Sequence, residues 1–180
     1  LILMKQKLTR ALIDEIRKEM PVLNEDEKKS IIGGQGVLYI IGEDGRITYS
    51  ENSSSDEVII VFGSIDSGNI IRLPGDTRID STPDGYMITG SGIDKACAEY
   101  INTHTCVEWA RYENSETGYS PGMNTSHHYR DVTIYAMPGC DTVYHNHEEN
   151  PNPSEADKAG KGHYKNNYIF FEKDGTYHSY

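Results

Sequence analysis

The residues best suited to chemistry lie between 145 and 157, where two histidines are followed by a serine and an aspartate. His145 and His147 come directly after a β-favouring run over 142–144, so we expect them at the end of a strand. Alternate residues of a strand point to the same face, which would place the two imidazoles side by side. Two neighbouring imidazoles supply half of the ligands of a tetrahedral zinc site.

A carboxylate is expected to join the histidines from the start of a helix. Pro153 disfavours a helix interior, Ser154 is a favourable N-cap, and Asp157 falls three residues later, in the first turn. Asp157 can therefore turn back toward His145 and His147. Two histidines and one carboxylate leave a fourth position for water, which is typical of catalytic rather than structural zinc.

This order, His-x-His followed by Ser-x-x-Asp, resembles the motif of the JAMM (JAB1/MPN-type) metallopeptidases. It is similar in particular to the JAB-like domains of bacterial polymorphic toxins, over roughly residues 93–180. The resemblance implies an α/β fold with a cytidine deaminase-like core. It also implies Zn²⁺ held by His145, His147 and Asp157, with Ser154 as a further site residue, and hydrolysis of a peptide or isopeptide bond in a protein substrate.

The family also has a glutamate at the start of an upstream strand, and Glu108 occupies a matching place after a predicted helix. Its neighbours Val107 and Trp109 are apolar, and the Val-Glu-Trp sequence is similar to that of the toxin branch. Burial between them would raise the pKa of Glu108 toward the working pH of a general base. The resemblance therefore implies Glu108 and Ser154 as catalytic residues, with Ser154 stabilising the oxyanion.

The sequence departs from the family pattern in the loop that joins the two halves of the motif. The six residues between His147 and Ser154 are one fewer than usual, and Glu148 stands where a proline is expected. A loop tolerates such a deletion, but Glu148 could compete for the metal. These departures motivate an alternative function, a catalytically inert, metal-binding JAMM-like module that acts in protein–protein recognition. Taken alone, His-x-His could be a surface histidine pair and Ser-x-x-Asp an ordinary helix cap. The two motifs in this order, with Glu108 upstream, favour metal binding.

The letters His-Asn-His at 145–147 suggest a second alternative, a nuclease. That class needs a ββα arrangement and basic groove residues, whereas the flanks here are acidic. The net charge of −11 would repel a phosphate backbone, so we expect no nucleic-acid partner.

Length and composition predict one domain of ordinary size with a hydrophobic core, since the chain has 180 residues of which 36% are hydrophobic. No apolar run approaches the ~20 residues of a membrane-spanning helix, so we expect none. Cys97, Cys106 and Cys140 form no Cys-x-x-Cys pair, and their odd number leaves at least one thiol free or in an intermolecular bond. Cys140, close to His145 in sequence, is an alternative ligand.

Residues 1–34 are predicted to form a separate helical segment. Apolar residues recur every four positions from Leu8 to Met20, and Pro21 ends this helix. A second, shorter helix ends at Gly33-Gly34, which resembles the cleavage site of a double-glycine leader. The resemblance implies an ABC exporter peptidase as a partner, export from a bacterium and, for a toxin, a cognate immunity protein. The alternative is that the two glycines only cap a helix.

The remaining chain is predicted to be mixed α/β, with few helices. Residues 35–90 are expected to form a β-rich meander, with a hairpin around the turn at 43–45 and a buried strand over 58–62. Residues 91–180 would form the JAMM-like core, with a helix over 93–101, a β-rich run over 132–137 and a last hairpin around 173–175.

Overall fold

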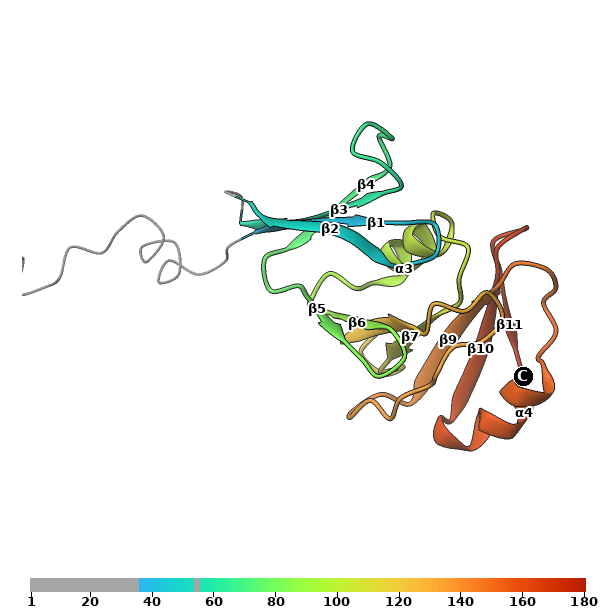
Figure 1. Ribbon diagram of the computed structural model, residues 1–180. Helices are drawn as coiled ribbons and strands as arrows, with labels where there is room; N and C mark the ends of the chain where they lie inside the picture. The colour runs from blue at the N-terminus through green and yellow to red at the C-terminus, as the bar shows by residue number, and fades with distance from the viewer. Residues whose placement is uncertain (1–35, 54–55) are drawn as a thin grey trace, which may run out of the picture. The chain divides into compact units, whose positions relative to one another are not determined.

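The computed structural model describes residues 36–53 and 56–180, which belong to one compact unit (Figure 1). The predicted leader over 1–34, including Gly33-Gly34, lies outside the described residues. The described part is a mixed α/β structure made mostly of strands, in two sheets with two short α-helices. None of its helices is long and apolar enough to cross a membrane.

The first sheet has four strands in the order β2-β1-β3-β4. They are β1 (Val37–Ile41), β2 (Ile47–Asn52), β3 (Glu57–Phe62) and β4 (Ile70–Pro74). The predicted hairpin is confirmed, because β1 and β2 pair antiparallel and Gly45 takes the positive φ of 72° that its turn needs. The predicted buried strand is confirmed as β3, but it pairs parallel to β1, so the segment is not a simple meander.

The second sheet has seven strands in the order β11-β10-β9-β7-β8-β6-β5. They are β5 (Arg78–Ser81), β6 (Tyr86–Thr89), β7 (Trp109–Glu113), β8 (Gly122–Thr125), β9 (Thr142–His147), β10 (Asn166–Phe171) and β11 (Thr176–Ser179). Only the β9–β10 pair is parallel, and the predicted last hairpin is β10–β11. Since β5 and β6 belong to this sheet, the division expected at residue 90 does not separate the two sheets.

The helix predicted over 93–101 is α3 (Lys95–Asn102), and it begins where Asp94 accepts a hydrogen bond from the backbone N–H of Cys97 at 2.8 Å. Its buried face contributes Ile101 to a hydrophobic cluster that also contains Phe62 of β3 and Trp109 of β7. This cluster fixes the position at which the chain leaves α3 and enters β7, directly after Glu108. The second helix, α4 (Glu155–Gly160), is followed by a 3₁₀ turn, η1 (Lys161–His163).

The strand-like run at 132–137 forms no strand, which corrects the β assignment. Side chains instead of a neighbouring strand satisfy its backbone. The N–H groups of Thr133, Tyr135 and Met137 donate to the hydroxyls of Ser126, Tyr112 and Tyr164 at 2.9, 2.9 and 2.8 Å. The segment is therefore fixed in place without a ladder, and it lies beside the candidate site described next.

Candidate metal centre

The structure brings the two histidines of β9 and the aspartate of α4 together. His145 and His147 point to the same face, as strand alternation predicts, and their Nε2 atoms lie 3.1 Å apart. The Oδ1 atom of Asp157 lies 3.1 Å from Nε2 of His145, and its Oδ2 lies 3.5 Å from Nε2 of His147. The ligand atoms of the three side chains all lie within 4.8 Å of one another, so the group could hold a metal ion.

The distances between the candidate ligand atoms fit a tetrahedral metal ion. Zinc–ligand bonds of 2.0–2.1 Å place tetrahedral ligand atoms about 3.3 Å apart, and the distances here are 3.1–3.5 Å. Nδ1 of His147 lies 3.1 Å from the backbone carbonyl oxygen of Asn150, an acceptor for an Nδ1–H. With a metal bound, a proton on Nδ1 would leave the Nε2 lone pair free for the ion, as metal-bound histidines require.

Asp157 is held by the start of its own helix. Ser154 is the N-cap of α4, and the two residues form a capping box as the sequence predicts. The backbone N–H of Ser154 donates to Oδ2 of Asp157 at 2.6 Å, and the backbone N–H of Asp157 donates to Oγ of Ser154 at 3.1 Å. Burial raises the pKa of Asp157, but the hydrogen bonds with His145 and His147 lower it by more than burial raises it. The net pKa is therefore lowered, and the carboxylate stays ionised.

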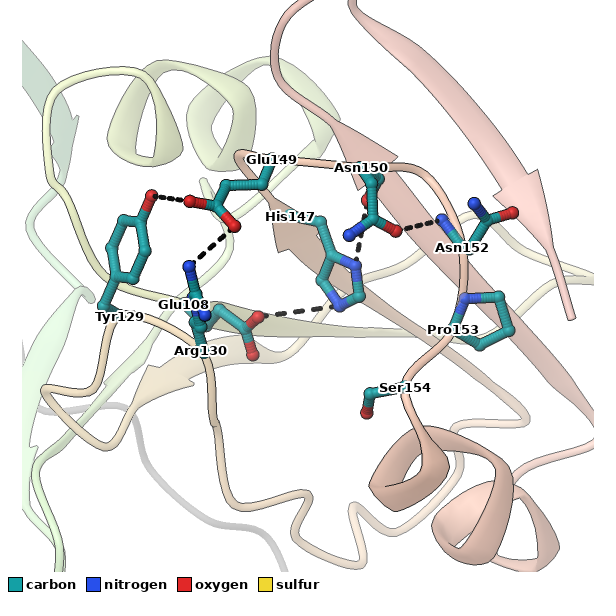
Figure 2. A pocket seen from close by; sticks show the side chains of 9 residues that line it. All are labelled: Glu108, Tyr129, Arg130, His147, Glu149, Asn150, Asn152, Pro153 and Ser154. Atoms are coloured by element: carbon teal, nitrogen blue, oxygen red, sulfur yellow. Dashed lines mark hydrogen bonds and ion pairs between the residues drawn. The ribbon is translucent and has the colours of Figure 1, made fainter.

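Glu108 lies at the edge of this group. It directly precedes β7, is 7% exposed, and its Oε1 lies 3.5 Å from Nε2 of His147 (Figure 2). Burial raises the pKa of Glu108 to about 8; nearby His147 lowers it, and the negative charge of Asp157 adds to the rise. Glu108 is therefore a carboxyl group that exchanges protons near neutral pH, next to the three candidate ligands.

Asn146 is the site residue that the sequence reasoning missed. Its side chain is buried between the two histidines and points to the other face of β9. It accepts a hydrogen bond from the backbone N–H of Trp109 at 2.6 Å and donates one to the backbone carbonyl of Val107 at 3.2 Å. It also donates to Glu172. The sequence did contain a signal for Asn146. It is a polar residue between two candidate ligands, on the strand face that alternation predicts to be opposite to them.

Two cavities flank the group. The first, of about 230 Å³, is lined by Glu108, His147 and Ser154 together with the loops at 129–130 and 149–153 (Figure 2). The second, of about 220 Å³, shares Glu108, Ser154 and Arg130 with the first and adds Asp157. Arg130 donates to Glu149 at 2.7 Å, so an exposed ion pair joins the two loops at the first cavity.

Other sequence candidates lie outside the group. Glu148 is exposed and does not belong to the His145–His147–Asp157 cluster. All three cysteines are free thiols, and Cys140 is not part of the cluster. His127 and His128 follow the end of β8, and His127 has a positive φ of 58°. Neither histidine joins the metal group within the described part of the chain.

Comparison of the chain with models of known protein families, with curated proteins and with solved structures found no match. The assignment of this site therefore rests on its own residues and their geometry.

Proposed function

We propose that the chain is a zinc-dependent, JAMM-like peptidase or isopeptidase, the hydrolytic domain of an exported bacterial toxin or effector. The observation that carries the proposal is the convergence of His145, His147 and Asp157 beside a buried Glu108 at two open cavities. This combination supplies a metal site, a group that exchanges protons and room for a substrate.

The protein's own residues suit hydrolysis. Zn²⁺ held by the three ligands would supply a Lewis acid and lower the pKa of a water from 15.7 to about 7. The carboxylate of Glu108 would accept the proton of the attacking water and pass it to the leaving nitrogen. The Ser154 hydroxyl accepts the N–H of Asp157, so its own hydrogen is free to donate to the developing oxyanion.

The partners follow from the same proposal. The proposed substrate is a protein or peptide, as the resemblance to JAMM metallopeptidases implies, and the two cavities beside Glu108 and Ser154 offer room for it. An exporter peptidase acting at Gly33-Gly34 and a cognate immunity protein are proposed from the resemblance of residues 1–34 and 93–180 to exported toxins. A net charge of −11 argues against a nucleic-acid substrate.

A second candidate is the inert, metal-binding recognition module. The departures of the loop between His147 and Ser154 favour it, because this loop is one residue shorter than in the family and has Glu148 in place of a proline. In that case the metal would stabilise the fold around β9 and α4 without turnover.

The deciding experiment combines metal content with turnover. Mass spectrometry of the purified protein should find about one zinc per chain, lost in His147→Ala and kept in His178→Ala, a matched change in β11. Zinc-loaded protein should then cleave polypeptide substrates, and Glu108→Gln should bind zinc without cleaving. Failure to take up zinc would refute the peptidase, whereas zinc binding with no difference between wild type and Glu108→Gln across a broad substrate panel would favour the recognition module.

A further inference from the structure

The Nδ1 atoms of His145 and His147 have different surroundings. Nδ1 of His147 faces the carbonyl oxygen of Asn150. Nδ1 of His145 is buried and has no hydrogen-bond partner among the described residues. A metal-bound histidine almost always donates this N–H to a carboxylate, a carbonyl or a water, because that bond fixes the tautomer and the ring orientation. A proton on Nδ1 of His145 therefore has no acceptor among the described residues.

A small internal cavity adjoins this histidine on the side of α3. It has a volume of about 10 Å³, and His145, Asn102 and Arg111 are among its lining residues. Oδ1 of Asn102 is also buried without a hydrogen-bond partner among the described residues. Thus one cavity is lined by two residues that each have an unpaired polar atom, a donor on one side and an acceptor on the other.

We propose that this cavity holds one ordered water molecule that connects His145 to Asn102. The water accepts the Nδ1–H of His145 and donates to Oδ1 of Asn102, and the guanidinium of Arg111 offers further donors. A cavity of about 10–15 Å³ is large enough for one water, which typically makes about three hydrogen bonds to polar groups that would otherwise be unpaired. Asn102 is then a positioning residue, which acts on the metal through the water and His145.

The consequence concerns the tautomer of the ligand. A proton held on Nδ1 leaves the Nε2 lone pair directed at the site, 3.1 Å from both Asp157 and His147. Both histidines are then prepared for the metal, one by the carbonyl of Asn150 and the other by the water. This inference deepens the proposed function, since its effect on metal affinity rests on the same site.

The test compares two changes at Asn102 with a control. Asn102→Leu keeps the approximate volume and removes the acceptor, whereas Asn102→Asp keeps an oxygen in place. Ser120→Ala is the matched control, because Ser120 Oγ is another buried oxygen without a partner, in a residue that does not line this cavity. Competition with a chromogenic chelator measures zinc affinity. We expect about 10- to 100-fold weaker binding in Asn102→Leu, and affinities close to wild type in Asn102→Asp and Ser120→Ala.

Nitrogen NMR of the imidazoles provides a readout that a purely structural role would not move. In the metal-free wild type, Nδ1 of His145 should carry a proton that gives a cross-peak to bound water, and Asn102→Leu should lose that cross-peak. An unprotonated Nδ1 of His145 in the wild type, or unchanged zinc affinity in a folded Asn102→Leu, would overturn the inference. The wild-type spectrum requires neither a variant nor a metal, so it decides the water bridge even if the chain fails to bind zinc.

Discussion

Oδ1 of Asn146 accepts the backbone N–H of Trp109 at 2.6 Å, at the point where the β7–β9 ladder ends. Because the same amide donates to the carbonyl of Val107, it holds the main chain on both sides of Glu108. The residue between the two candidate ligands therefore fixes the position of the candidate base. One strand, β9, positions the two candidate metal-binding histidines on one face and Glu108 through Asn146 on the other.

We expect Asn146→Leu to lower the free energy of unfolding by roughly 2–4 kcal/mol, because it leaves buried backbone groups of two residues unpaired. In the proposed enzyme it should also reduce turnover, since Glu108 loses its support. Asn124→Leu is the matched control: Asn124 is fully buried and bonds Tyr112 and Thr133, away from the metal group. Chemical denaturation and assays of the folded fraction check both effects. Equal losses of turnover per folded molecule in the two variants would contradict the role of Asn146.

Glu108 should make the metal-free protein less stable as the pH rises. Its folded pKa of about 8 lies above the unfolded value of about 4.3. Between these values the folded state binds more protons than the unfolded state, so stability is full below about pH 4 and is lost progressively up to about pH 8. The raised pKa of His147 has the same sign of effect, with burial opposing it and Asp157 and Glu108 producing it.

Glu108→Gln separates the two contributions, because glutamine resembles the protonated acid and does not ionise. In urea titrations with a chelator present, we expect the variant to gain stability over wild type from pH 5 to pH 8, with the gap widening as the pH rises. Each unit of pKa elevation corresponds to about 1.4 kcal/mol. The exposed Glu116→Gln should leave the slope unchanged. A constant gap across this range would show that Glu108 is ionised in the folded state throughout.

Short-range patterns were sufficient to predict that His145, His147 and Asp157 could form one group. Strand alternation placed His145 and His147 on one face, and the capping pattern placed Asp157 in the first turn of a helix. Both features depend on residues within three positions of each other. The helix α3 and the hairpins β1–β2 and β10–β11 were predictable for the same reason.

Long-range pairing was not predictable in this way. The parallel pair of β1 and β3, and the place of β5 and β6 in the second sheet, depend on contacts between distant segments. The run over 132–137 has the composition of a strand, but hydroxyl groups from other parts of the chain take up its backbone N–H groups. Asn146 belongs to the same class, because its partners at 107 and 109 lie far away in sequence.

Among the described residues, Arg130 is the only lysine or arginine that lines either cavity beside the site. Its side chain and that of Glu149 are 70% and 53% exposed, so breaking their ion pair should change stability by no more than about 1 kcal/mol. Glu149→Gln frees Arg130 for a substrate carboxylate, and should lower KM for peptides with an acidic residue beside the cleaved bond. Arg130→Gln should raise the KM for the same peptides, by up to about fivefold.

Peptide kinetics at low and high salt check this prediction, because screening should shrink both changes. Arg72→Gln breaks an ion pair of similar exposure, with Glu57, away from both cavities and should have no effect on KM. The prediction requires that Arg130→Gln and Glu149→Gln shift KM in opposite directions. A parallel shift would mean that the pair only shapes the loops.

Ser154 combines a structural and a proposed chemical role, and two substitutions separate them. Ser154→Ala removes the cap of α4, which should cost about 1 kcal/mol of stability and weaken zinc binding by loosening Asp157. Ser154→Asn keeps a favoured N-cap and should keep zinc affinity, but it lacks the hydroxyl. If that hydroxyl stabilises the oxyanion, kcat should fall about 10²- to 10³-fold in both variants. Zinc titration and steady-state kinetics measure the two effects. A wild-type kcat in Ser154→Asn would show that Ser154 acts only as the N-cap of α4.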